Sequence, residues 1–183
     1  MSMPDEYSYE IKIPKLRTAV LIGTKGDIKK KIQAETGTTV HIDSKNNVVT
    51  VSGSDAISLM DAQNIIKAIA RGFNPEIAFS LLKPDYNLEI IDLKYVAKNK
   101  NDLGRIKGRI IGFNGKSRRQ IEELTETDVC VFGKTVSIIG EISNVSLAKR
   151  AISNLIQGSQ HTKVFLWLEK QRKIQRFEDG NEL

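Results

Sequence analysis

The order of apolar and polar residues predicts a β-hairpin in each half of the chain. In the first half, apolar residues alternate with polar ones on both sides of a polar turn at 44–47. These apolar residues are Val40, Ile42, Val49 and Val51. A period of two is typical of a strand with one buried face and one face in solvent. The second hairpin is expected to turn at 133–134.

Other segments repeat apolar residues every three or four positions, which is the spacing of an amphipathic helix. Ile28 and Ile32 share one face of such a helix. We expect Gly37 to end it, because glycine readily adopts the left-handed conformation. Longer helices are expected at 54–71 and 144–157. With a β-rich run at the start of each half, the predicted order is β-α-α-β-β-α, twice.

The two halves are copies of one another, which makes each half the unit of the fold. Residues 20–32 return as residues 109–121, 89 positions later. We therefore predict an α+β protein with two tandem domains, each a three-stranded antiparallel sheet with helices packed on one face. The expected boundaries are 7–72 for the first domain, 73–86 for a linker, 87–160 for the second domain with a basic insertion at 94–110, and 161–183 for a C-terminal helix and tail. The two domains are expected to pack together, since units of this size bury only a modest fraction of their surface alone.

Charge is distributed very unevenly along this chain of 183 residues. Lys and Arg number 28 against 22 Asp and Glu, a formal charge of +6. Residues 98–119 alone hold eight basic residues and one acid, a local charge of +7, which leaves −1 for the rest. The composition, 40% hydrophobic, suits a folded protein, and the basic segment favours a polyanionic partner such as nucleic acid.

The composition also excludes several classes of function. The longest apolar runs are a few residues, so no membrane segment or secretion signal is expected, and the simplest location is cytoplasmic. A single cysteine, Cys130, and two histidines leave no disulfide and no zinc site. No catalytic Ser/His/Asp or Cys/His set and no P-loop can be assembled, so we expect neither an enzyme nor a cofactor.

A Gly-x-x-Gly loop recurs at the same place in both copies, at 23–26 and 112–115. Glycines allow a backbone to pass close to a phosphate chain, and the amino terminus of a following helix attracts phosphate. One isolated match is usually an ordinary turn. Here the loop occurs twice in the same strand order, each time with two basic residues just beyond it.

This combination resembles the KH domain of type I, β-α-α-β-β-α, over nearly the whole chain as two tandem copies. KH domains clamp about four single-stranded nucleotides, with the loop on the backbone and the bases in an apolar groove. The resemblance implies that the RNA-binding residues of the first copy are Gly23, Thr24, Lys25, Gly26, Lys29 and Lys30. Those of the second copy are Ile111, Gly112, Phe113, Asn114, Gly115, Lys116, Arg118 and Arg119. We add Arg105, Lys107 and Arg109, because this basic run leads directly into the second loop.

The apolar groove that the resemblance implies uses aliphatic residues that would suit a core equally well. The candidates are Ile22, Ile28, Ile32, Val40 and Ile42 in the first copy, and Ile111, Ile121, Val129 and Val131 in the second. For Ile32, Val40, Ile121 and Val129 we favour the core.

Two residues of the second copy depart from the pattern. Glu126 stands where the first copy has Gly37, so we expect a different helix exit there, with an acid near the groove. Phe113 is bulky for such a loop. It either stacks on a base, worth about 1 to 3 kcal/mol, or contacts a protein partner, and the sequence favours neither.

Further motifs resemble the archaeal form of the Dim-two, or partner-of-Nob-one, family, with the KRR-type paralogue as the nearest alternative. They lie at 74–82, 89–93, 105–112, 121–125 and 133–136. The resemblance implies a small-subunit assembly factor that binds single-stranded RNA near the 3′ end of the small-subunit ribosomal RNA. It also implies the Nob-one endonuclease as a partner, with dimethyladenosine transferase and the alpha subunit of initiation factor two as further candidates.

The resulting hypothesis is a single-stranded RNA-binding protein that acts in small-subunit assembly and pre-rRNA 3′ end processing. One alternative is a protein scaffold for a processing nuclease or an initiation factor. Another is a general KH-type regulator of RNA.

Overall fold

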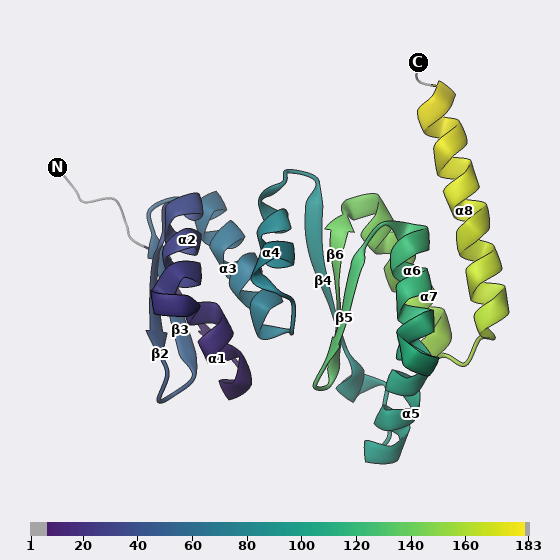
Figure 1. The fold of residues 1–183 in the computed structure, drawn as a ribbon, viewed down its shortest axis with the longest axis horizontal. Helices are drawn as coiled ribbons and strands as arrows, with labels where there is room; N and C mark the ends of the chain where they lie inside the picture. The colour runs from purple at the N-terminus through teal and green to yellow at the C-terminus, as the bar shows by residue number, and fades with distance from the viewer. Residues whose placement is uncertain (1–6, 182–183) are drawn as a thin grey trace. The chain divides into compact units, whose positions relative to one another are not determined.

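The computed structural model describes residues 7–181, which form two compact units that divide between residues 84 and 85 (Figure 1). Each unit has a three-stranded antiparallel sheet and helices, so the predicted α+β class and the tandem arrangement are confirmed. Residues 182–183 of the predicted C-terminal tail lie outside the described part.

In the first unit the central strand is β3, in the order β1-β3-β2. The elements are β1 (Tyr7–Lys12), α1 (Lys15–Ile22), α2 (Asp27–Thr36), β2 (Thr39–Asp43), β3 (Val48–Gly53) and α3 (Ala56–Ala70). The predicted hairpin is confirmed, with Val40 paired to Val51 and Ile42 to Val49. The helices α1 and α2 pack against α3, which also packs against β3. Ile32, Val40, Val49 and Val51 are buried in the resulting core.

The segment expected as a linker is folded for most of its length. It contains α4 (Pro75–Ala78) and the 3-10 turn η2 (Phe79–Leu82), and both pack against α3. Phe73, Ala78 and Leu81 are buried. The ammonium group of Lys31 on α2 lies 4.3 Å from the centre of the Phe79 ring. Residues 73–84 therefore belong to the first unit, because their apolar side chains are covered there.

The second unit repeats this plan and adds one helix. Its strands follow the order β4-β6-β5. The elements are β4 (Tyr86–Asp92), the 3-10 turn η3 (Leu93–Tyr95), α5 (Lys100–Ile111), α6 (Lys116–Thr125), β5 (Asp128–Phe132), β6 (Thr135–Glu141), α7 (Ile142–Ile156) and α8 (His161–Asn181). Most of the basic insertion thus forms η3 and α5. The added helix α8 (Figure 1) packs along α6 and α7, and its Val164 and Leu168 are buried.

In both units the helix that precedes the hairpin, α2 or α6, ends at the same pair of buried threonine hydroxyl groups. The Thr36 hydroxyl donates to the Ile32 carbonyl at 2.7 Å and lies 2.8 Å from the Thr38 hydroxyl. In the second unit Thr125 and Thr127 repeat this arrangement at the same distances. The two copies are therefore equivalent in their buried polar contacts as well as in their sheets.

The carboxyl end of helix α6 has the same type of backbone conformation as the carboxyl end of α2, which corrects our expectation that these two helix exits differ. Glu126 has φ 52° and ψ 43°, and Gly37 has φ 65° and ψ 20°, so both residues are in the left-handed conformation. The Glu126 carboxylate lies 3.4 Å from Arg172 of α8. The prediction was wrong because Glu126 accepts the left-handed backbone, which costs a residue with a side chain about 1 kcal/mol.

This shared conformation predicts opposite effects on stability at the two exits. Gly37→Ala should lower the free energy of unfolding by about 1 kcal/mol, because a Cβ there meets nothing within 4 Å and only backbone strain is added. Glu126→Gly should raise the free energy of unfolding by up to about 1 kcal/mol. Both are measured by denaturant unfolding. Gly104→Ala, in an open position within α5, is the control and should be stabilising because alanine favours a helix. Destabilisation by both exit substitutions would contradict the strain account.

Candidate RNA-binding site

The two glycine loops have the same backbone conformation. Gly23 and Gly112 have φ of 74° and 72° with extended ψ, and each ends the preceding helix. Lys25 and Asn114, the third residues of the two loops, have φ of 54° and 49°. The last glycines, at 26 and 115, precede the first residue of α2 and of α6. Each loop is thus a tight connection between two helices.

The first glycine of each loop is required by space as well as by φ. A Cβ on Gly23 would lie 1.9 Å from the Asp27 carboxylate and 2.9 Å from the Ile28 backbone nitrogen. A Cβ on Gly112 would lie 2.7 Å from Cβ of Ser117 and 2.8 Å from its backbone nitrogen. No such crowding exists at Gly115. The backbone therefore turns sharply at the first glycine, while the last glycine leaves an open surface.

The helices that follow the two loops begin with opposite charges. Helix α2 begins with Asp27, whose carboxylate accepts a hydrogen bond from the Ile28 backbone N–H at 2.7 Å. Helix α6 begins with Lys116, which is exposed and makes no ion pair within residues 7–181. The amino terminus of a helix attracts an anion. In the first unit a carboxylate of the protein already occupies that position, whereas in the second unit the position carries a positive charge.

The predicted basic residues of the second unit have unequal freedom. Arg105 forms an ion pair with Asp102 at 2.7 Å, and Arg118 forms one with Glu122 at 2.7 Å. Arg119 donates to the Asn114 carbonyl at 2.7 Å and so fixes the loop itself. In the first unit, Lys25 of the loop and Lys29 and Lys30 of α2 make no ion pair among the described residues.

Arg109, for which we predicted a phosphate contact, has its guanidinium group engaged within the protein. Its guanidinium donates to the carbonyls of Leu155 and Ser159 at 3.0 and 2.5 Å, at the end of α7. In the first unit Arg17 donates in the same way to Ile69 and to Phe73, beyond the end of α3. Both arginines thus join the first helix of their unit to carbonyls at or beyond the end of the helix that follows the hairpin. We therefore treat Arg109 as a residue that joins α5 to α7 rather than as part of the exposed site.

Burial separates the groove candidates into two sets. Ile32, Val40, Ile121 and Val129 are at most 3% exposed and belong to the core, as we favoured. The half-buried candidates are Ile22, Ile28, Ile42, Ile111 and Val131. These five remain available to line a groove beside the loops. Phe113 is 86% exposed, so its ring contributes nothing to the core and is free to contact a ligand or a partner.

A side chain from the helix after each loop fixes the first residues of the neighbouring strand. In the second unit the Glu122 carboxylate accepts from the Val129 N–H at 2.8 Å, and in the first unit the Gln33 amide oxygen accepts from Val40 at 2.9 Å. Burial raises the pKa of Glu122 above the ordinary value, and the hydrogen bond from Val129 and the charge of Arg118 only partly offset this rise. The bond positions β5 beside α6, where the resemblance to KH domains implies the groove.

Two features of the site were missed in the sequence. Asp27 aligns with Lys116 at the same 89-residue shift that pairs the loops, so the charge difference was visible as a mismatch within the repeat. The hydrogen bond from Lys107 Nζ to the Gly133 carbonyl, at 3.0 Å, was not visible, because it joins α5 to a turn 26 residues away.

No group of three or more His, Cys, Asp or Glu side chains within residues 7–181 is placed to hold a metal ion. None of the helices in that range is long and apolar enough to cross a membrane.

Comparison with known proteins places both units in one family of domains. Residues 87–173 match a family model for the second KH domain of PNO1, described as a eukaryotic type KH domain of type I. Residues 8–68 match the KH domain model. A KH domain-containing protein of Methanocaldococcus jannaschii is 46% identical over 91% of this chain and 75% of that protein.

Two further relatives carry names that refer to ribosomal RNA. The pre-rRNA-processing protein PNO1 of Coccidioides immitis is 35% identical over 61% of this chain and 45% of that protein. The chain spans about half the length of several of the curated eukaryotic relatives it matches. A crystal structure of an a/eIF2alpha–aDim2p–rRNA complex from Pyrococcus horikoshii matches with a TM-score of 0.86 and 42% identity, over 92% of this chain and 95% of that one.

The raised pKa of Glu122 predicts a stability difference that depends on pH. Because the folded state holds the Glu122 proton more tightly than the unfolded state, this group makes the free energy of unfolding fall as pH rises above about 4.5. Glu122→Gln keeps an oxygen that accepts from Val129, as Gln33 does in the first unit. The variant should therefore gain stability relative to the wild type as pH rises through this range, measured by denaturant unfolding at several pH values. Glu123→Gln, at an exposed neighbour on α6, is the control for the loss of one carboxylate from this helix. A pH-independent difference for Glu122→Gln would contradict the assignment.

Proposed function

Because this chain belongs to the PNO1/Dim2 family of tandem KH-domain proteins, we propose that it binds single-stranded ribosomal RNA near the 3′ end of the small-subunit RNA. In this role it acts in assembly of the small ribosomal subunit and in pre-rRNA 3′ end processing. Names of relatives that refer to pre-rRNA processing and to an rRNA complex support this proposal. The protein acts in the cytoplasm and binds the RNA without catalysing a reaction on it.

The observation that carries the proposal is the second glycine loop. Its open glycine, Gly115, and the amino terminus of α6 give a surface that a phosphate group can approach closely. Lys116 adds a positive charge at that surface, and the exposed ring of Phe113 is available to stack on a base. The half-buried aliphatic residues Ile111 and Val131 provide an apolar wall for the bases beside it.

A scaffold function is the second candidate, and one observation favours it. The similar Pyrococcus horikoshii chain was crystallised with the alpha subunit of initiation factor two as well as with rRNA. We include this initiation factor subunit among the partners of the present chain. The Nob-one endonuclease and dimethyladenosine transferase are further proposed partners, and they rest on the family resemblance alone.

Asn114→Asp tests the clamp of the second unit. The variant adds a negative charge where the RNA backbone is proposed to lie, and aspartate tolerates the left-handed backbone that Asn114 adopts. It should weaken binding of an oligonucleotide with the small-subunit 3′ end sequence by at least about five-fold, equivalent to about 1 kcal/mol. Binding is measured by fluorescence anisotropy over a salt series. The log-log slope against salt should be about −0.7 for each phosphate contact in the wild type.

Asn87→Asp is the matched control for this measurement. It makes the same charge change on β4, the edge strand away from β5, and its side-chain oxygen still accepts from the Leu88 N–H. Equal losses in the two variants would mean that only net charge matters, which contradicts the clamp. Unchanged RNA affinity with lost association of the initiation factor subunit would favour the scaffold function.

Asp27→Lys tests why the two loops differ. In a chain that already carries Asn114→Asp, this change removes the carboxylate from the start of α2 and places a cation there, as in the second unit. RNA affinity should rise, because a phosphate group can then approach the helix terminus. Glu35→Lys makes the same charge change near the other end of α2 and should give a smaller gain. Equal gains from the two substitutions would show that position at the loop is unimportant.

A further inference from the structure

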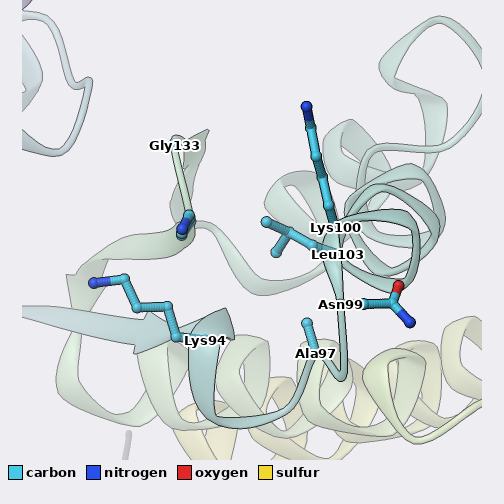
Figure 2. A pocket seen from close by; sticks show the side chains of 7 residues that line it. Lys94, Ala97, Asn99, Lys100, Leu103 and Gly133 are labelled. Atoms are coloured by element: carbon cyan, nitrogen blue, oxygen red, sulfur yellow. The ribbon is translucent and has the colours of Figure 1, made fainter.

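A pocket of about 650 Å³ lies in the second unit, on the part of α5 remote from the glycine loop. Its walls come from η3 and the segment that follows it, from the start of α5, and from the turn between β5 and β6 (Figure 2). The lining residues are Lys94, Ala97, Asn99, Lys100, Leu103, Gly133 and Lys134. Figure 2 shows Leu103 directed toward the turn at Gly133, while the Asn99 amide is turned away.

Main-chain and side-chain hydrogen bonds fix the walls of this pocket. The Leu93 N–H donates to the Lys134 carbonyl at 2.8 Å, which ties the turn to the end of β4. Lys107 of α5 donates to the Gly133 carbonyl at 3.0 Å. The Asn99 side chain accepts from the Asp102 N–H at 2.9 Å and so caps α5. The cavity is therefore held open by contacts that exist without a ligand.

The pocket combines an apolar interior with a cationic rim. Ala97 and Leu103 supply the apolar surface, and Lys94, Lys100 and Lys134 supply the charge. None of these three lysines forms an ion pair within residues 7–181.

Two carboxylates near this rim, Asp92 and Asp102, leave it positively charged, because Asp102 is paired with Arg105 and Asp92 is a single charge against three lysines. Asp102 accepts from the Lys98 N–H and from Arg105, and these bonds lower its pKa. Asp92 accepts from the Lys94 N–H at 2.9 Å. The rim is therefore suited to an anionic ligand, and the interior to a flat apolar one.

The pocket and the glycine loop lie along the same helix. From Leu103 to Ile111 helix α5 rises by about 12 Å, at 1.5 Å per residue. Tyr95, on the same short turn as Lys94, is 89% exposed, and an exposed aromatic ring beside basic residues is typical of surfaces that stack nucleic-acid bases.

We propose that this pocket holds a nucleotide of the bound RNA that lies outside the stretch held by the glycine loop. The base packs against Ala97 and Leu103, and the adjoining phosphates are bound by Lys94, Lys100 and Lys134. The inference rests on the proposed function, since the same RNA strand must occupy the loop. An acidic protein segment would match the charge of the rim, but continuity with the loop and the apolar interior favour RNA.

Length dependence of RNA binding tests this inference. A short oligonucleotide of about four nucleotides fills one KH clamp, and a longer one of about ten reaches beyond it. Lys94→Gln with Lys134→Gln should leave affinity for the short RNA unchanged and remove most of the gain that the wild type shows on lengthening. The salt slope for the longer RNA should become shallower by about 1.4, for two lost phosphate contacts. Tyr95→Ser should weaken only the longer RNA, by at least about five-fold.

Lys170→Gln with Lys173→Gln is the matched control, because it removes two exposed lysines from α8 and should affect neither length. Wild-type behaviour of the pocket variant, in a protein whose Asn114→Asp variant loses affinity, would overturn the pocket and leave the clamp intact. Equal loss for both RNA lengths would overturn the pocket in favour of a diffuse charge effect. Loss of initiation factor binding alone would overturn it in favour of a protein site. No RNA binding by the wild type would instead overturn the proposed function.

Discussion

The close approach of two helices at one glycine is the constraint on which the site depends. A side chain at Gly112 would overlap Ser117 of the following helix, so α5 and α6 meet at this angle only with glycine between them. That angle places the amino terminus of α6 at the protein surface. It also brings Arg119 to the loop carbonyl of Asn114, so that the loop is held by the helix it precedes. The phosphate-binding surface is thus a consequence of backbone packing, and the basic side chains act on a geometry that already exists.

The repeat separates what this geometry requires from what RNA binding requires. Both units have closely similar loop dihedral angles and the same buried threonine pair, and in both an arginine joins the first helix to carbonyls at the end of the helix that follows the hairpin. The units differ at the first residue of the following helix, Asp27 or Lys116. Asp27 stabilises its helix by about 0.3 to 1 kcal/mol, since a carboxylate is favourable at a helix amino terminus. The same carboxylate opposes a phosphate group, so in the first unit the terminus contributes to folding and in the second it is available to a ligand.

The sequence predicts most of the fold because its patterns are local and occur twice. Alternation around Val40 and Val51 gives the hairpin, and helical spacing places Ile32 in the core. The sequence does not predict contacts between residues that are far apart in the chain. It also does not predict where a residue adopts a strained backbone conformation at a small cost in free energy. The partners of Arg109 are 46 and 50 residues away, and no local pattern specifies them. Glu126 adopts a backbone conformation that its residue type disfavours, because the threonines on either side fix the exit.

The fold determines how much of the charge of the basic segment 98–119 is available to a ligand. Residues 98–119 carry a local charge of +7, yet all four arginines of this segment have their guanidinium groups engaged within the protein, namely Arg105, Arg109, Arg118 and Arg119. An arginine that already donates to a carboxylate or a carbonyl must break those bonds before it can donate to a phosphate, which reduces its net contribution to binding. The exposed lysines have no such cost. The effective positive surface is therefore carried by lysines at the two ends of α5, with Lys116 at the loop and Lys94, Lys100 and Lys134 at the pocket, while Arg109 between them joins α5 to the end of α7.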